Sequence, residues 1–206
     1  MYYTPPSLAE SVVGVAIQWA PPGAVFLEVG VGEGALFRLL PSPKRGVEVR
    51  RRPERGIPGV EYGTDVMKWS PPASWKGRDV VVVMNPPFNR QVEILNRCAR
   101  MQCRSLRVVW IAGLNVRHWD TEDKIDPLMH LFNEWLVPPG QSVFETKAGG
   151  EKRIRTVVQV WERKEEERRL WKDVRFRPPV GFSSSKCADA NVVVTQVNSR
   201  CQVGAA

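Results

Sequence analysis

The chain of 206 residues is long enough for one α/β domain with a continuous core and short for two. Its 43% hydrophobic and 25% charged residues are typical of a globular protein and exclude wholesale disorder. No apolar run approaches the roughly 18 residues of a membrane helix, and the N-terminus lacks the basic-then-apolar order of a secretory signal. We therefore expect a soluble, intracellular protein with no membrane partner. The formal net charge of +8 suits a phosphate-rich partner such as nucleic acid, although many basic proteins bind none.

The cysteines do not have the spacing of a metal site. They form no CxxC pair, and His118 and His130 lie far from them in sequence. We expect reduced thiols and no bound metal. The four residues are Cys98, Cys103, Cys187 and Cys201.

The N-terminal segment predicts an extended arm over residues 2–6 and then a helix over 7–19. Leu8, Val12, Val15 and Trp19 recur at spacings of four, three and four, which is the pattern of one apolar helix face. Two prolines and a glycine then break the chain. Beyond this break the pattern predicts a strand over 24–30, a brief helix over 33–40, and short strands over 46–49 and 60–65.

The clearest strand covers residues 79–85, because four consecutive valines have poor helix propensity and suit a sheet that is covered on both faces. We expect this strand to be central. The pattern next predicts a helix over 91–104, a strand over 106–112, and a helix over 125–136 that ends before two prolines. This alternation predicts an α/β fold with a Rossmann-like, doubly wound and mostly parallel sheet.

The pattern changes after Gly140. Two strand-like runs, 142–146 and 154–161, flank a Gly-Gly pair and predict an antiparallel C-terminal hairpin that closes the sheet. The mixed charge run over 162–169 is typical of a solvated helix or linker. We predict one domain over 1–163, then a charged linker and a small appendage over 164–206 that contains a short strand.

Alternating glycines follow the first predicted strand. In Glu28-Val29-Gly30-Val31-Gly32 they let the backbone pass close to a ligand, and a following helix would offer free N–H groups. A purely structural turn and a dinucleotide site are both compatible with this loop. Two acidic strand ends favour a nucleoside: Glu48 can accept both ribose hydroxyls, and Asp65 can accept the adenine amino group.

The sharpest motif is Asn85-Pro86-Pro87-Phe88, at the end of the predicted central strand. A strand followed by a proline turn would explain the prolines alone. The chemistry of an aromatic amine explains the whole motif, because the conjugated lone pair must be turned toward an electrophile. The side-chain oxygen of Asn85 and the carbonyl of Pro86 can accept the two amino hydrogens, Pro87 stiffens the turn, and Phe88 can stack on a flat base. These groups would act by orientation and by stabilising positive charge on nitrogen.

These motifs resemble the class I S-adenosylmethionine-dependent amino-methyltransferases, and specifically the gamma-type adenine-N6 enzymes, including small viral and phage-borne members. The resemblance covers residues 3–163 and includes Val157–Arg163, which is similar to the family's last strand. Glu28 stands where Asp is commoner, the segment between Gly34 and Glu48 is short, and no large target-recognition domain follows.

The resemblance implies S-adenosyl-L-methionine as the cofactor and nucleic acid as the partner. Thr4 and Pro5 match the motif that folds over the methionine end of the cofactor. The other cofactor-binding residues that it implies are Glu28, Gly30, Gly32, Glu48, Asp65 and Asn85. The catalytic residues that it implies are Asn85, Pro86, Pro87 and Phe88.

Arginines recur after the catalytic motif at spacings of three, four and three, namely Arg97, Arg100, Arg104 and Arg107. On one continuous helix they would share a face. A solvated face is the ordinary interpretation, and a stripe that contacts substrate phosphates is the functional one. We assign Arg97 and Arg100, with Phe88, to substrate binding.

The sequence thus predicts methyl transfer to adenine N6 in nucleic acid, with DNA slightly favoured over RNA. Two alternatives remain open. A protein glutamine amide has a planar NH2 that could use the same acceptors. The chain could also be a cofactor-binding but inactive subunit of a nucleic-acid-modifying complex, and a dimer or a partner subunit is possible.

Overall fold

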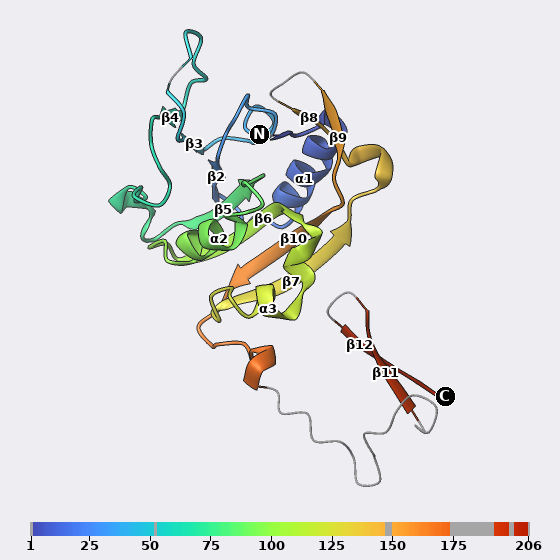
Figure 1. Cartoon of the computed structure of the whole chain (residues 1–206). Helices are drawn as coiled ribbons and strands as arrows, with labels where there is room; N and C mark the ends of the chain where they lie inside the picture. The colour runs from blue at the N-terminus through green and yellow to red at the C-terminus, as the bar shows by residue number, and fades with distance from the viewer. Residues whose placement is uncertain (1, 52, 147–149, 174–191, 198–199, 206) are drawn as a thin grey trace.

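A seven-stranded mixed sheet forms the centre of the protein. The computed structural model describes residues 2–51, 53–146, 150–173, 192–197 and 200–205. The strand order is β4-β3-β2-β5-β6-β10-β7; the first five strands are parallel, and β10 and β7 run antiparallel to their neighbours (Figure 1). This arrangement confirms the predicted Rossmann-like, mostly parallel sheet. Its strands are β2 (Val25–Val29), β3 (Lys44–Glu48), β4 (Val60–Tyr62), β5 (Asp79–Met84), β6 (Ser105–Gly113), β7 (Met129–Leu136) and β10 (Thr156–Arg163).

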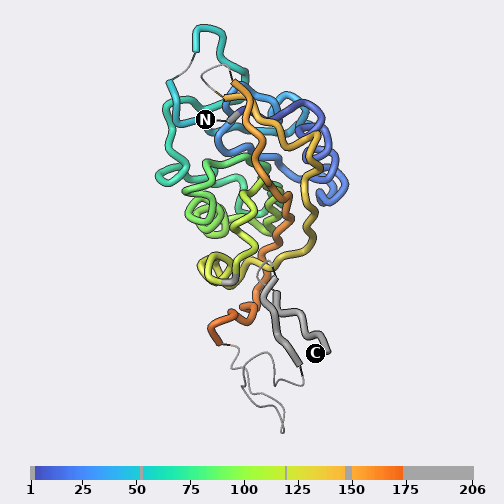
Figure 2. The backbone as a smooth tube through the Cα atoms, turned by 45° about the vertical axis from the view of Figure 1, so that its right-hand side comes forward, coloured from blue at the N-terminus to red at the C-terminus, as the bar shows by residue number. Residues whose placement is uncertain are grey.

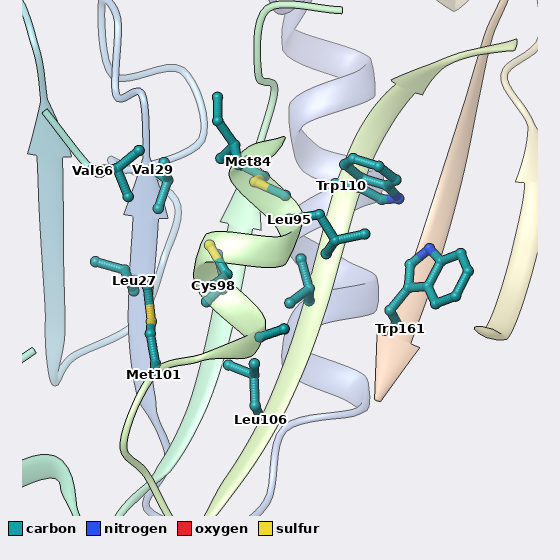
Figure 3. Packing of buried hydrophobic residues seen from close by; sticks show 14 of the residues in the cluster. Leu27, Val29, Val66, Met84, Leu95, Cys98, Met101, Leu106, Trp110 and Trp161 are labelled. Carbon is teal, nitrogen blue, oxygen red and sulfur yellow. The ribbon is translucent and has the colours of Figure 1, made fainter. Parts of the chain in front are cut away.

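Two helices cover opposite faces of this sheet (Figures 1 and 2). Helix α1 (Pro6–Gln18) buries Leu8 and Val12, which confirms the helix predicted over 7–19. Helix α2 (Gln91–Ala99) lies on the other face, where Leu95 and Cys98 point toward the sheet (Figure 3). The shorter helices are α3 (Trp119–Glu122), η1 (Ala73–Trp75), η2 (Leu114–Arg117), η3 (Pro139–Gln141) and η4 (Trp171–Asp173).

The valine strand β5 is central, as predicted, because β2 and β6 pair with its two edges. Alternate valines serve two cores, since successive side chains of a strand point to opposite faces. Val80 and Val82 join the core under α2, whereas Val81 and Val83 join the core under α1. A run of valines therefore fills both faces of one strand.

A second, three-stranded sheet holds the N-terminal arm. Strand β1 (Tyr2–Tyr3) pairs antiparallel with β8 (Val143–Thr146), which pairs in turn with β9 (Glu151–Arg153). The predicted strand near residue 191 is β11 (Val192–Val197), and its antiparallel partner is β12 (Arg200–Ala205). Asn191 lies outside the described residues.

The helix predicted over 33–40 is wrong, because this segment forms a series of turns. The amide of Gly34 bonds to the carbonyl of Val31, and Gly34 itself has a φ of +86°. The Lys44 Nζ atom donates to the carbonyls of Phe37 (2.8 Å) and Leu40 (2.7 Å). A lysine from β3 thus binds backbone oxygens of this segment, and compact turns replace the helix.

The helix predicted over 125–136 is also wrong, because most of it forms strand β7. β7 pairs with β10, with Val158 opposite Trp135 and Trp161 opposite Leu131. Backbone pairing with a long neighbouring strand overrides the weak local preference of the segment. The antiparallel closure of the main sheet therefore consists of β10 and β7, whereas the run over 142–146 contributes to the small sheet.

The charged run after β10 is mostly exposed, as expected for a solvated linker, but one of its arginines is packed against the domain. The half-buried Arg168 donates to the carbonyls of Glu122, Ile125 and Met129 at 2.7 to 3.0 Å. The guanidinium of Arg168 also lies 5.8 Å from the centroid of the Trp161 ring. Arg168 thus anchors this exposed segment to the domain, and the division into a domain over 1–163 and an appendage over 164–206 stays a prediction.

Candidate active site

A cavity of about 640 Å³ opens at the carboxyl ends of the parallel strands. Ligands of doubly wound folds bind at this edge, where the loops of neighbouring strands converge. The cavity brings together eight residues that the sequence assigned to one site: Gly30, Gly32, Glu48, Asp65, Asn85, Pro86, Pro87 and Phe88. Its remaining lining is Tyr3, Val29, Val47, Val49, Thr64, Val66, Asn89, Arg90 and Ile94, none of which the sequence analysis assigned to the site.

The glycine loop leaves its inner side open. Gly30 and Gly32 have φ values of +76° and +60°, which glycine adopts without strain. A Cβ added at Gly30 would meet no atom within 4 Å. The Gly30 amide donates to the Val47 carbonyl at 2.8 Å, and the Gly32 amide donates to Glu48 Oε2 at 2.7 Å. The loop therefore provides space for a ligand, while its amides are bonded to protein oxygens.

Glu48 is buried and held from two sides. Its Oε1 accepts from the Arg50 amide at 3.0 Å and from Arg50 Nε at 3.1 Å, and Arg50 also reaches Glu33 at 3.0 Å. Oε1 thus accepts two hydrogen bonds, whereas Oε2 accepts one from Gly32 and keeps a second lone pair. Glu48 is thus a rigid acceptor at the floor of the cavity.

Asp65 and two valines form the neighbouring wall. Asp65 Oδ1 accepts from the Met67 amide at 3.0 Å, and within the part of the chain that the structure describes no group donates to Oδ2. Val49 is 63% exposed although it is apolar, and it lines the cavity together with the buried Val66. Val49 and Val66 directly follow Glu48 and Asp65 in the sequence. Their position next to two predicted cofactor-binding residues was the signal that could have identified them as cavity residues.

Glu28 lies beneath the cavity and does not line it. The side chain is 2% exposed, and Oε2 is a buried oxygen with no hydrogen-bond partner among the described residues. Burial raises the pKa of Glu28 well above 4.5, and the negative charge of Glu48 raises it further, while the Phe37 amide and Lys44 act in the opposite direction. Cofactor contact by Glu28 stays a prediction.

Asn85 presents an unused acceptor. Its Nδ2 donates to Thr4 Oγ1 at 3.0 Å. No donor from the described parts of the chain reaches Asn85 Oδ1 or the Pro86 carbonyl, and both residues line the cavity. Thr4 and Pro5 are not among the lining residues, so their predicted contact with a cofactor also stays a prediction.

The Phe88 ring is backed by the end of β6. A Cβ added at Gly113 would lie 3.4 Å from Phe88 Cγ, so the absence of a side chain there makes room for the ring. The buried Gln91 accepts from the Gly113 amide at 3.0 Å and donates to Asn115 Oδ1 at 3.1 Å. The first residue of α2 thus fixes the strand end behind the ring.

The predicted stripe of arginines on one helix face is wrong, because α2 ends at Ala99 and β6 begins at Ser105. Arg97 donates to the carbonyls of Met67 and Trp69 and thereby holds the loop that follows Asp65. The exposed Arg100 caps the C-terminal end of α2, away from the end that begins beside Phe88. Neither arginine lines the cavity, and their substrate contact stays a prediction.

The other two arginines of that series are paired. Arg104 bonds to the carboxylate of Asp79, and with Ser105 it lowers the pKa of Asp79 to about 2. Arg107 pairs with Glu162 at 3.0 Å.

Among the described residues, no three His, Cys, Asp or Glu side chains form a group that could hold a metal ion. Cys98 and Cys103 are free thiols, whereas Cys187 and the side chain of Cys201 lie outside the description. No helix among the described residues is long and apolar enough to cross a membrane.

Solved methyltransferases share this fold. No family model matches the chain, and no curated protein matches it. The 23S rRNA methyltransferase ErmE is 17% identical, with a TM-score of 0.52 over 77% of this chain and 69% of its own. A proposed RNA methyltransferase from Pyrococcus horikoshii is 17% identical, with a TM-score of 0.55 over 82% of this chain and 87% of its own. A dimethyladenosine transferase from Plasmodium falciparum is 13% identical, with a TM-score of 0.55 over 80% of this chain and 64% of its own.

Proposed function

We propose that this protein is an S-adenosylmethionine-dependent methyltransferase that acts on the exocyclic N6 amine of adenine in nucleic acid. The observation that carries the proposal is the pair of unused acceptors, Asn85 Oδ1 and the Pro86 carbonyl, beside the Phe88 ring in the cavity. A planar amine between these acceptors would have both hydrogens bonded and its lone pair directed out of its own plane.

The cavity fits the nucleoside part of S-adenosylmethionine. Glu48 Oε2 offers a rigidly held acceptor for a ribose hydroxyl, and Asp65 Oδ2 offers an acceptor for an adenine amino group. The exposed Val49 and the buried Val66 provide apolar contact for a flat ring. When bound, the cofactor supplies an electrophilic methyl group on a sulfonium.

The same loop fits a dinucleotide poorly. A pyrophosphate is bound by free amides at the N-terminus of a helix. Here the Gly32 amide already donates to Glu48, and turns replace the helix after the loop. A carboxylate at this position would also repel phosphate, whereas it attracts a cationic cofactor.

The acceptors would work by orientation and charge. The Asn85 and Pro86 oxygens are not useful bases, so they would hold the amine while positive charge develops on nitrogen, and the proton would leave to water afterwards. Phe88 would stack on the base and keep it out of any helix. The formal charge of +8 supports a nucleic-acid substrate.

The nucleic acid that carries the adenine is RNA or DNA. The sequence slightly favoured DNA, but the fold neighbours include proteins named for action on rRNA and for dimethyladenosine transfer. These names support RNA as the first substrate to test. An unpaired adenine should react faster than one in a stable duplex, because unstacking costs a few kcal/mol.

The deciding experiment measures transfer of a tritiated methyl group from S-adenosylmethionine to RNA, DNA and protein pools. We expect 6-methyladenine in nucleic acid from the wild type, and a loss of about a hundredfold or more in rate for Asn85→Ala, with cofactor affinity changed less than about twofold. Asn133→Ala, at an exposed position of β7, is the matched control. Label in glutamine side chains would instead favour the protein substrate, and no transfer by the pure protein would favour an inactive subunit.

Calorimetry tests the cofactor separately. We expect S-adenosylmethionine and its demethylated product to bind and to raise the melting temperature. Binding of nicotinamide dinucleotides in their place would contradict the cofactor assignment.

A further inference from the structure

The N-terminal arm passes beside Asn85 and is fixed on both sides. Strand β1 pairs with β8, where Tyr3 is opposite Glu145, and Tyr3 lines the cavity. On the other side the arm enters α1, where the Ala9 amide donates to the Pro5 carbonyl at 2.9 Å and Leu8 is fully buried. Thr4 lies between these anchors, so the position of its backbone is set by two packed elements.

Thr4 makes one hydrogen bond within the described structure, and its partner is the proposed catalytic amide. The Asn85 Nδ2 atom donates to Thr4 Oγ1 at 3.0 Å, across 81 residues of sequence. Thr4 is half-buried and does not line the cavity. The Thr4 hydroxyl therefore contacts the Asn85 amide and not a ligand in the cavity.

The orientation of this amide decides which chemistry it offers. One end of an asparagine side chain accepts hydrogen bonds and the other end donates them. With Nδ2 bonded to Thr4, Oδ1 remains for the substrate amine. A reversed amide would present NH2 to NH2, and neither group would find an acceptor there.

We propose that Thr4 is the positioning residue that holds Asn85 with Oδ1 toward the substrate amine. This inference rests on the proposed function and gives the small sheet β1-β8-β9 a role, since that sheet fixes the arm on which Thr4 lies. It differs from the cofactor contact predicted from the sequence for Thr4, and the two roles predict different kinetics.

Thr4→Val removes the hydroxyl and keeps the shape of the side chain. A neutral hydrogen bond contributes about 0.5 to 1.5 kcal/mol, so kcat should fall roughly twofold to tenfold. The cofactor Kd should stay within about twofold, and Thr4→Ser should recover most of the lost rate. Thr121→Val, the same change in the remote helix α3, is the matched control and should leave kcat unchanged.

Nuclear magnetic resonance of the Asn85 side-chain NH2 provides a readout that does not depend on turnover. In the wild type one amide hydrogen should be protected from solvent exchange, and this protection should disappear in Thr4→Val and return in Thr4→Ser. Equal exchange in wild type and Thr4→Val would overturn the proposal, even if the wild type proves to transfer no methyl group.

The kinetic outcomes are equally decisive. A weaker cofactor Kd with unchanged kcat would make Thr4 a cofactor ligand and overturn the positioning role. A Thr4→Ser variant as slow as Thr4→Val would assign the loss to packing of the arm and not to the hydroxyl. In another outcome, the wild type methylates no substrate, but protection of the Asn85 amide hydrogen is lost in Thr4→Val and restored in Thr4→Ser. The proposed function then fails, but the Thr4–Asn85 contact stands.

Discussion

Polar side chains in the two halves of the main sheet have different hydrogen-bond partners. In the antiparallel half, Gln159 accepts from the indole nitrogens of Trp110 (3.1 Å) and Trp161 (2.9 Å) and donates to Glu134 at 3.1 Å. Among the described residues of the parallel half, Asn85 Oδ1 and Asp65 Oδ2 have no donor. Gln159 thus stabilises the antiparallel half by bonds within the protein, whereas Asn85 and Asp65 keep acceptors available at the cavity.

This difference favours the parallel half of the sheet as the place where a ligand binds. A polar group that lines a cavity can bond to a ligand or to water, whereas a polar group in the core depends on partners within the protein. The cavity lies at the loops that follow β2, β3, β4 and β5. In β10, both ends of the Gln159 amide are bonded within the protein, and the buried Thr156 hydroxyl, which has no partner among the described residues, does not line the cavity. Substitutions in the antiparallel half should therefore change stability, and substitutions at the cavity should change binding and rate.

The largest expected effect is that of Gln159→Leu on the free energy of unfolding. The variant leaves two buried indole N–H groups without an acceptor, at about 1 to 3 kcal/mol each. Urea denaturation should show a loss of roughly 2 to 6 kcal/mol, while the folded variant should bind S-adenosylmethionine as the wild type does. Gln102→Leu, at an exposed position, is the matched control. Weaker cofactor binding by folded Gln159→Leu would show that the halves are not independent.

A smaller effect of opposite sign is expected for Glu28→Gln. The pKa of Glu28 is raised in the folded protein, chiefly by burial, so the folded state holds a proton that the unfolded chain loses above about pH 4.5. The contribution of Glu28 to stability therefore falls as pH rises above 4.5. The stability difference between Glu28→Gln and the wild type should shift in favour of the variant between pH 4.5 and 7.5. A difference that is constant with pH would contradict the raised pKa.

The smallest change in stability is expected for Gly30→Ala. This substitution is also the most specific test of ligand binding in the cavity. Alanine at a φ of +76° costs about 1 kcal/mol, and the added methyl group enters the open space of the glycine loop. Cofactor affinity should fall about tenfold or more by calorimetry. Gly23→Ala has nearly the same φ of +72° and equally open surroundings, but it lies outside the cavity. It should lose the same stability and no affinity, and equal loss of affinity in both variants would refute the contact at Gly30.

Much of the fold followed from local pattern. The valines of β5, the apolar face of α1 and the glycine loop after β2 lie where the sequence predicted them. The residues of the candidate cavity were also predictable where a strand end coincides with a distinctive side chain, as at Glu48, Asp65 and Asn85. Tyr3 and Arg90 were not, because nothing in their local sequence separates them from ordinary surface residues.

The sequence by itself determined the central parallel strands and the side chains at their carboxyl ends, because hydrophobic runs and strand termini are properties of neighbouring residues. Only the tertiary structure decided that residues 33–40 form turns, since Lys44 binds the carbonyl oxygens of Phe37 and Leu40. It also decided that residues 129–136 form a strand, because β10 provides a partner for their backbone. The contact between Thr4 and Asn85 joins residues 81 positions apart, and no local preference of either residue specifies it. Such contacts depend on which elements pack together, and that is settled by the free energy of the whole fold.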